Sequence, residues 1–188
     1  MKSGKVVKVF VSRNGHTVTL RYPTIKDLDG ALTYANNLIK EDTYVEIYGK
    51  PLTRAEEKKW LEDALKRIKK GEMIQLVVEI GGHYVGSASL TRGVRRKSHV
   101  AAAAIGLARE YREEGIGTIL FHSLLDEGSK LGLRLIELSC FENNPRALHV
   151  YEKIGFKTIG VIPGAIHFKD AYVGEVKMYL PLDESPAH

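Results

Sequence analysis

The order of patterns along the chain predicts an α+β fold built on a mixed, mostly antiparallel sheet. Strand-like runs joined by tight turns stand at both ends, and two amphipathic helical segments follow the first of them. Between these lies a strand–helix–strand unit, which needs a parallel crossover. We therefore expect a central β-α-β crossover in a sheet of about seven strands, flanked by about four helices. A length of 188 residues fits one domain, 1–188, with its core at about 17–180.

The opening segment reads as one strand or as a hairpin. Residues 6–11 are apolar and β-branched, residues 16–22 alternate, and Asn14-Gly15 supplies a turn between them. Thr24 then caps a first helix, and Asp27 is placed to complete the cap. One apolar face is expected on this helix, formed by Leu28, Ala31, Leu32, Ala35, Leu38 and Ile39.

A second helix begins at Thr53, where Thr53 and Glu56 form a capping box, and ends at Gly71. Residues 41–51, which join the two helices, are expected to be a loop or a broken helix. The buried stripe of the second helix should consist of Trp60, Leu61, Ala64, Leu65 and Ile68.

The rest of the chain alternates strands and helices. The small apolar run 99–108 is expected to be a fully buried strand. Residues 181–188 are expected to be a frayed tail. The other strands are predicted at 74–80, 83–91, 133–140, 157–167 and 172–180, and the other helices at 116–131 and 145–154.

Composition excludes several classes of protein. The formal charge is +5, and one cysteine, Cys140, permits no disulfide within a monomer, which suits the cytoplasm. No apolar run approaches the ~20 residues that cross a bilayer, and no signal-peptide core follows the basic N-terminus. The histidines lack metal-ligand spacing, so no metal is expected. Binding of nucleic acid would depend on one basic turn, which lacks the aromatic side chains on which the bases of a single strand stack. This turn is formed by Arg92, Arg95, Arg96 and Lys97.

A glycine-bearing loop, residues 112–117, stands between the buried strand and a helix. Glycines there let backbone N–H groups converge, and the helix adds its positive end, so the loop suits a diphosphate. The alternative is an ordinary turn that uses glycine for backbone freedom. Arg112 either supplies charge or hydrogen-bonds the loop. The loop is neither a Walker motif nor a full G-x-G-x-x-G fingerprint.

A second motif opens the following helix. Asn144 can cap it, with Pro145 in the first position. Ala147 and Tyr151 are four residues apart and share one face, which leaves room for a ligand beside a phenol. The alternative is an amphipathic helix with a core tyrosine.

Together the two motifs resemble the GNAT superfamily of acyl-CoA-dependent N-acetyltransferases. The pattern [Arg/Gln]-x-x-Gly-x-[Gly/Ala] matches Arg112, Gly115 and Gly117. The pattern Asn-x-x-Ala-x-x-x-Tyr-x-x-x-Gly-Phe matches its five defined positions, which are Asn144, Ala147, Tyr151, Gly155 and Phe156. The resemblance extends over about residues 17–180. It implies a GNAT-like fold and acetyl-CoA as co-substrate.

The resemblance also implies which residues hold the cofactor. The strand end should lie along the pantetheine arm, and the amide of Leu107 should face the thioester carbonyl. Glu113 stands where relatives often have glycine, and both Glu113 and Glu114 are expected to point to solvent, away from the diphosphate. The cofactor-binding set is Ile105, Gly106, Leu107, Arg112, Glu113, Glu114, Gly115, Ile116, Gly117, Thr118, Asn144, Ala147 and Tyr151.

By the same resemblance Tyr151 either protonates the leaving sulfur or only hydrogen-bonds it. The acceptor amine needs a proton acceptor, and many relatives place a carboxylate where this chain has four alanines, 101–104. Glu137 is the candidate base, although an outward-facing strand residue would look the same. The other candidates are Glu79, His83 and His99.

In relatives, the acceptor pocket is lined by the segment between the first two helices and by the final hairpin. A small-molecule or amino-acid amine and a protein N-terminus are equally expected acceptors, followed by polyamines and then by aminoglycosides. The alternative function is a catalytically idle acyl-CoA-binding regulatory module, and a homodimer is an allowed assembly. The candidate pocket residues here are Glu41, Asp42, Tyr44, Glu46, Tyr48, His167, Lys169, Asp170 and Tyr172.

Overall fold

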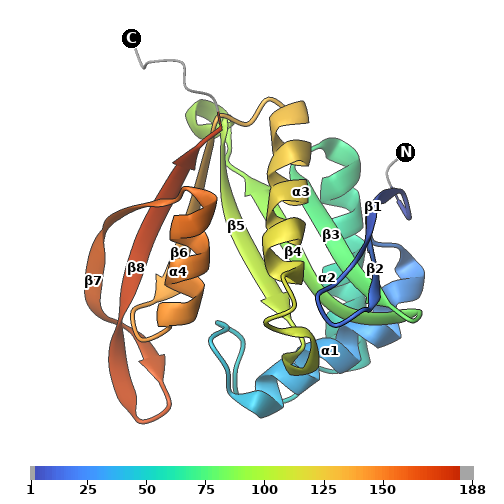
Figure 1. Ribbon diagram of the computed structural model, residues 1–188, viewed down its shortest axis with the longest axis horizontal. Coiled ribbons are helices and arrows are strands. Elements are labelled where there is room, and N and C mark those ends of the chain that lie inside the picture. Colours follow the sequence, from blue (N-terminus) through green and yellow to red (C-terminus); the bar gives the residue numbers. More distant parts are fainter. Residues whose placement is uncertain (1–2, 183–188) are drawn as a thin grey trace.

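The computed structural model describes residues 3–182 and contains an eight-stranded mixed sheet with four α-helices (Figure 1). The strand order is β1-β2-β3-β4-β5-β6-β8-β7, and β5 and β6 form the one parallel pair in this part of the chain. The strands are β1 (Val6–Val11), β2 (Thr17–Arg21), β3 (Met73–Ile80), β4 (His83–Arg92), β5 (Val100–Leu107), β6 (Leu135–Phe141), β7 (Lys157–Phe168) and β8 (Ala171–Pro181).

The helices lie on the two faces of this sheet. Figure 1 shows α3 (Ile116–Lys130) and α4 (Pro145–Ile154) in front of the strands, with α1 (Leu28–Glu41) and α2 (Arg54–Lys70) behind them. The largest buried side chains of α3 join the core against β3, β4 and β5; they are Ile116, Leu120, Phe121 and Leu124. The α+β fold with its central crossover is therefore confirmed. The sheet has eight strands because the opening segment is a hairpin.

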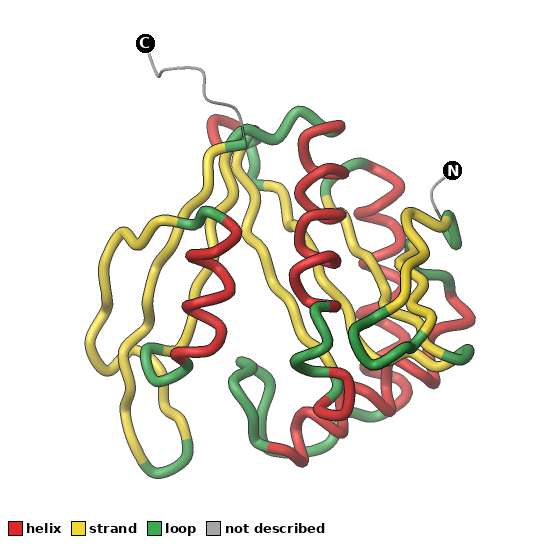
Figure 2. The backbone as a smooth tube through the Cα atoms, in the orientation of Figure 1, coloured by secondary structure: helices red, strands yellow, loops and turns green. Residues whose placement is uncertain are grey.

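The caps predicted at the first two helices are present. Thr24 and Asp27 form a full capping box on a short 3₁₀ turn (Ile25–Asp27) that leads into α1, and Thr53 and Glu56 form another on α2. The tube in Figure 2 shows the long irregular connection between these helices, as expected for residues 41–51. The predicted tail lies almost entirely outside the described residues.

Two burial predictions are wrong. Trp60 is 48% exposed, because the buried face of α2 runs through Glu57, Leu61, Ala64 and Ile68 instead. Strand β5 is fully buried only at Val100 and Ala101. The residues beyond them are more exposed because β5 pairs with β6 over three residues alone, from Val100↔Leu135 to Ala102↔Glu137.

Candidate active site

The site lies where β5 and β6 separate. Beyond the Ala102↔Glu137 pair the two strands no longer bond, and Figure 2 shows them diverging toward the lower edge of the sheet. A cavity of about 770 Å³ opens there. Its lining includes consecutive residues of β6, from Glu137 to Phe141. Since neighbouring side chains on a strand point to opposite faces, residues of both faces of the sheet line the cavity.

Beyond Ala102, the backbone groups of β5 that point away from β4 no longer bond to β6. The Ala108 amide bonds to the Val85 carbonyl of the neighbouring strand segment, at 2.8 Å. Amide directions alternate along a strand, so the Leu107 amide faces away from β4, toward the position that β6 has left. An N–H group in that position can donate to a carbonyl oxygen in the cavity.

Gly106 also has a packing role within the protein. A Cβ on Gly106 would collide with the hydroxyl of Tyr34 on α1 and would touch Leu38 Cδ1 at 3.8 Å. Glycine therefore allows α1 to pack closely against β5 at this position.

The loop of residues 112–117 has the geometry of an anion site. Glu113 and Gly115 adopt positive φ angles of 72° and 81°, and α3 begins at Ile116. The first intrahelical bond runs from Ile119 N to Gly115 O, so the amides of Ile116, Gly117 and Thr118 have no partner within the helix. A Cβ on Gly117 would make only an ordinary contact, 3.6 Å from Leu107 Cδ1. The internal packing does not require glycine there, which is what a close-approaching external ligand would explain.

Arg112 holds this loop together. Its Nε donates to the Leu107 carbonyl at 3.0 Å, and its two terminal nitrogens donate to the two carboxylate oxygens of Glu41, at 2.5 and 2.8 Å. Such a bidentate pair neutralises the guanidinium and fixes its orientation. Of the two roles considered for Arg112, the geometry therefore favours bonding of the loop over donation of charge to a ligand.

The two carboxylates of the loop point in opposite directions. Glu113 is exposed, as expected, and pairs with Arg146 at 2.8 Å. Glu114 is buried, so the prediction that it points to solvent is wrong. Its side chain is 2% exposed and accepts hydrogen bonds from Ser12 Oγ at 2.6 Å and His16 Nδ1 at 2.9 Å. These bonds hold the pKa of Glu114 below its ordinary value.

Tyr151 reaches the cavity from α4. Asn144 caps this helix by accepting from the Ala147 amide at 3.2 Å, and Asn144, Ala147 and Tyr151 all line the cavity. The phenol ring packs edge-on against Phe121 and Phe156, with centroids 5.9 and 6.0 Å away. Burial raises the pKa of Tyr151 well above its ordinary value, so the phenol stays protonated at neutral pH.

Glu137 lines the same cavity from β6 and is the one predicted base that does so. Glu79 is engaged by Arg21 Nε at 2.8 Å. His83 begins β4, and His99 precedes β5. None of these three lines either of the two cavities described here. The geometry thus brings Tyr151 and Glu137 to one cavity and leaves the alternative bases outside it.

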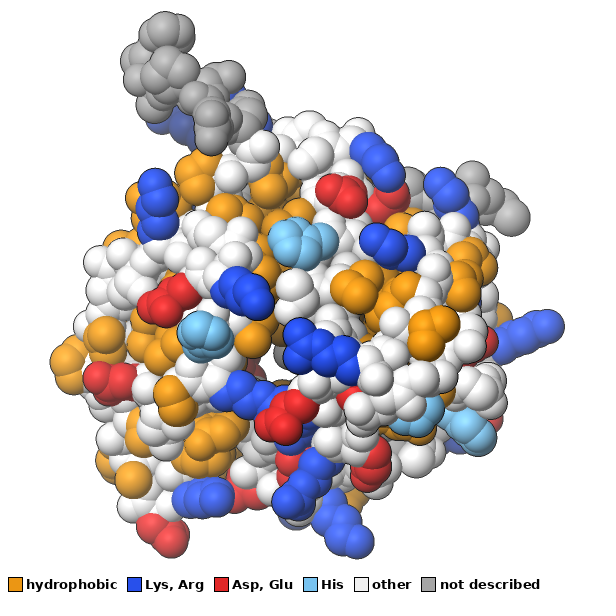
Figure 3. Space-filling model, in the orientation of Figure 1, with side chains coloured by type: hydrophobic (Ala, Val, Ile, Leu, Met, Phe, Trp, Pro, Cys, Tyr) orange, Lys and Arg blue, Asp and Glu red, His pale blue; other side chains and the backbone are white. Residues whose placement is uncertain are grey.

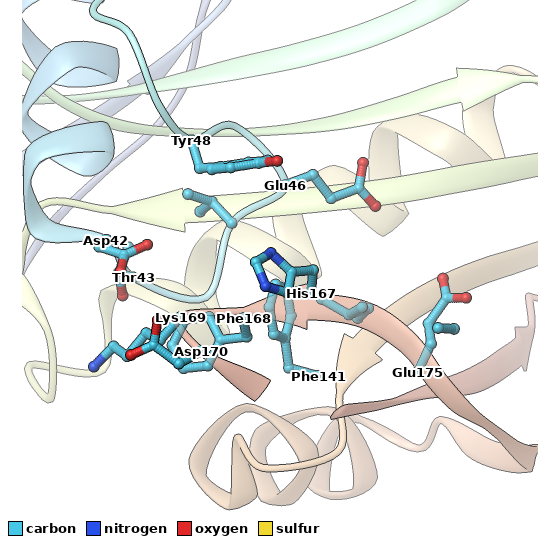
Figure 4. A pocket seen from close by; sticks show the side chains of 13 residues that line it. Asp42, Thr43, Glu46, Tyr48, Phe141, His167, Phe168, Lys169, Asp170 and Glu175 are labelled. Atoms are coloured by element: carbon cyan, nitrogen blue, oxygen red, sulfur yellow. The ribbon is translucent and has the colours of Figure 1, made fainter. Parts of the chain in front are cut away.

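A second cavity, of about 690 Å³, adjoins the first (Figure 4). The two share Val45, Glu46, Phe141 and Ile166. Figure 4 shows side chains of the α1–α2 connection facing those of the β7–β8 hairpin across it. Its charged lining contains one lysine, Lys169, and four carboxylates, from Asp42, Glu46, Asp170 and Glu175. This part of the site is therefore acidic, although the chain as a whole is basic.

Sequence reasoning missed several lining residues. Lys177 donates to Ser139 Oγ at 2.8 Å and to Glu175 Oε1 at 2.5 Å, and all three face the sheet side on which Glu137 lies. The alternation of Glu175, Lys177 and Tyr179 along β8 was a signal for one polar face. The pairing of that face with β6 depends on the sheet topology, which no local pattern encodes.

Other surface features carry no comparable site. No helix within residues 3–182 is long and apolar enough to cross a membrane. In the same part of the chain, no group of three or more His, Cys, Asp or Glu side chains could hold a metal ion. The exposed turn Arg95–Lys97 precedes β5, at the opposite end of that strand from the loop of residues 112–117.

Comparisons with known proteins agree with this geometry. Residues 39–156 match the model of the Acetyltransferase (GNAT) family. The chain is 28% identical over 93 residues to a probable N-acetyltransferase, camello, of Xenopus tropicalis, covering 48% of this chain and 42% of that protein. It is 27% identical over 154 residues to an uncharacterized N-acetyltransferase of Methanocaldococcus jannaschii, covering 79% and 64%. The chain thus spans less than two thirds of the length of either curated relative.

Among solved structures, the fold is similar to that of a Salmonella typhimurium protein determined with its cofactor acetyl-CoA. The TM-score is 0.78 at 18% identity, with 91% of this chain and 97% of that chain covered. Since the family model covers more than half of the chain, the protein belongs to the GNAT acetyltransferase family. The resemblance inferred from the two motifs is confirmed.

Proposed function

We propose that the protein is an N-acetyltransferase that transfers the acetyl group of acetyl-CoA to a primary amine by direct attack in a ternary complex. The observation that carries this proposal is the cavity at the β5–β6 separation, which is lined by Tyr151 and Glu137 together. A site lined by residues of both faces of a sheet can receive two substrates from opposite sides. The structural neighbour with bound acetyl-CoA supports the choice of co-substrate.

The chain offers a place for each part of acetyl-CoA. The free amides of Ile116, Gly117 and Thr118 can bind the diphosphate. Ile105 and Leu107, at the end of β5, would lie along the pantetheine arm. Asn144 and Ala147 line the cavity from α4. Acetyl-CoA supplies an activated thioester, and the rest of the chemistry falls to the protein.

Three groups would carry out the transfer. The Leu107 amide would donate to the carbonyl oxygen, which gains negative charge when the amine attacks. Tyr151 would donate a hydrogen bond or a proton to the departing sulfur. Its raised pKa favours a protonated donor, and a dry site also raises the pKa of the thiol that it serves. Glu137 would accept the amine proton, directly or through water.

The acidic cavity favours an acceptor that arrives with a positive charge. Carboxylates of the α1–α2 connection and the final hairpin line this cavity, and the rings of Tyr44, Phe141 and Phe168 pack against one another with centroids 4.9 to 5.6 Å apart. Such walls attract an ammonium group, whether on a small molecule, an amino acid or a protein N-terminus. We propose the cytoplasm as the compartment, because Cys140 is a free buried thiol.

The test is a thiol-release assay with acetyl-CoA against small amines, amino acids and N-terminal peptides. Release of CoA that depends on one class of amine, with the acetylated product identified by mass spectrometry, would support the proposal. Stoichiometric binding of acetyl-CoA without thiol release on any amine of the panel would contradict it and favour an acyl-CoA-binding regulatory module.

A further inference from the structure

The loop proposed to bind the diphosphate lacks the cation that its motif suggests. The guanidinium of Arg112 is already hydrogen-bonded to Glu41 and to the Leu107 carbonyl. Glu113 adds a negative charge beside the loop, which pairs with Arg146. Only backbone amides would then contact the doubly negative diphosphate, unless another side chain supplies positive charge.

The turn between β1 and β2, residues 12–16, is clamped onto this loop. The Arg13 amide donates to the Glu114 carbonyl at 3.2 Å. The buried Glu114 carboxylate accepts from Ser12 and His16, and the His16 ring packs edge-on against Tyr111 with centroids 5.4 Å apart. A buried carboxylate is held in place when its acceptor capacity is satisfied in this way. The turn and the loop therefore form one unit, although about 100 residues separate them in the sequence.

This clamp places Arg13 at the start of α3. A Cβ on Gly115, the N-cap residue, would lie 3.5 Å from Arg13 Nε and 3.9 Å from Arg13 Cζ. Arg13 is exposed, and no carboxylate pairs with its side chain in the described part of the chain. The guanidinium thus remains available beside the positive end of a helix. Figure 3 shows a hollow near the centre of this face with Lys or Arg side chains on its rim.

We propose that Arg13 is the phosphate-binding cation of the cofactor site and that Glu114 is its positioning residue. The proposal rests on the proposed function, because it assumes that acetyl-CoA occupies the loop. It adds a residue from outside the motif, delivered by the β1–β2 turn. An arginine at this place can bind either the diphosphate or the 3′-phosphate of CoA. The planar guanidinium can donate two parallel hydrogen bonds to the oxygens of either phosphate group.

The test is calorimetric titration of CoA, dephospho-CoA and pantetheine into wild type, Arg13→Gln and the charge-matched control Arg96→Gln. Arg96 is exposed in the turn before β5, away from the loop. Arg13→Gln should weaken CoA about tenfold, as loss of one exposed charge-assisted hydrogen bond does. It should leave pantetheine unchanged, and Arg96→Gln should match wild type. If Arg13→Gln weakens the binding of CoA but not of dephospho-CoA, Arg13 contacts the 3′-phosphate. If it weakens the binding of both, Arg13 contacts the diphosphate.

A double-mutant cycle tests the role of Glu114. Glu114→Gln should weaken CoA in the wild-type background but have little further effect in Arg13→Gln, because both changes remove the same contact. Equal losses in the two backgrounds would reject the positioning role.

The two proposals fail in different ways. Equal CoA affinity in wild type and Arg13→Gln would overturn the assignment of Arg13 alone. Wild-type protein that binds no CoA would overturn both the proposed function and this inference.

Discussion

The two sides of the site are built in different ways. On the proposed cofactor side, the loop of residues 112–117 offers backbone amides, and the side chains of Arg112 and Glu114 are engaged by contacts inside the protein. On the acceptor side, the cavity is lined by side chains from the α1–α2 connection, β6 and the final hairpin, with carboxylates in excess. A local backbone motif can bind the phosphates of CoA, because they do not change from one acceptor amine to another. Recognition of a particular acceptor amine needs side chains that come from distant segments of the chain.

The largest effect on CoA binding is expected when a side chain is added to the loop of residues 112–117. Gly117→Glu should weaken CoA binding by roughly 100-fold or more, because a carboxylate would occupy the anion position. The fold should survive, since a Cβ there meets only Leu107 at 3.6 Å. Calorimetric titration with CoA measures the effect. The control is Gly160→Glu on β7, where nothing lies within 4 Å of the added atom; unchanged affinity in Gly117→Glu would refute the loop assignment.

Tyr151→Phe tests the group proposed to donate to the departing sulfur. It should lower turnover by roughly 100-fold, the usual size for a lost proton donor, while CoA affinity stays within about twofold. Steady-state kinetics and calorimetry separate the two quantities. Tyr172→Phe is the control, because Tyr172 is 77% exposed on the hairpin and lines neither cavity, although sequence reasoning placed it in the acceptor pocket. Wild-type turnover in Tyr151→Phe would remove Tyr151 from the chemistry.

Glu137→Gln tests the acceptor side. It should lower turnover by roughly tenfold and change the pH–rate profile, because the group proposed to accept the amine proton is removed. The measurement is a pair of pH–rate profiles for wild type and variant. Glu79→Gln serves as the rival base and should keep the wild-type profile, since Arg21 already engages Glu79. Superimposable profiles for wild type and Glu137→Gln would discard Glu137.

The clamp at Glu114 predicts a dependence of stability on pH. Hydrogen bonds from Ser12 and His16 depress the pKa of Glu114 in the folded state. A depressed pKa stabilises the fold above the ordinary glutamate value of about 4.3, and this contribution is lost as the pH falls through the folded-state value. The unfolding free energies of wild type and Glu114→Gln should therefore differ at pH 7 and converge toward pH 3. A constant difference across that range would contradict the role of the carboxylate.

The smallest effect is expected at Glu113, whose φ of 72° is the conformation that glycine adopts most readily. Glu113→Gly should stabilise the protein by about 1 kcal/mol at most, because the strain of the left-handed residue is removed. It should also tighten CoA severalfold, since one negative charge leaves the loop. Thermal unfolding and calorimetry measure the two effects. Glu113→Gln separates charge from backbone strain, because it should tighten CoA without adding stability.

Prediction from sequence succeeded where the cause is local. The capping boxes at Thr24 and Thr53 and the Asn144 cap depend on residues a few positions apart, and the structure shows all three. It failed for Trp60, whose exposure depends on which face of α2 meets the sheet, and for Glu114, whose burial depends on a turn about 100 residues away. The partial exposure of β5 depends on where β6 leaves it, which is a property of the assembled sheet.

The amino-acid sequence by itself determined the class of fold, the family and the loop of residues 112–117, because spacing and glycine placement are short-range properties of the chain. Tertiary structure alone decided that Arg112 bonds Glu41, that Arg13 stands beside Gly115, and that Glu137 and Tyr151 line one cavity. The physical reason is that charge pairing and burial depend on distances in space. Those distances are set only when the sheet brings remote segments together.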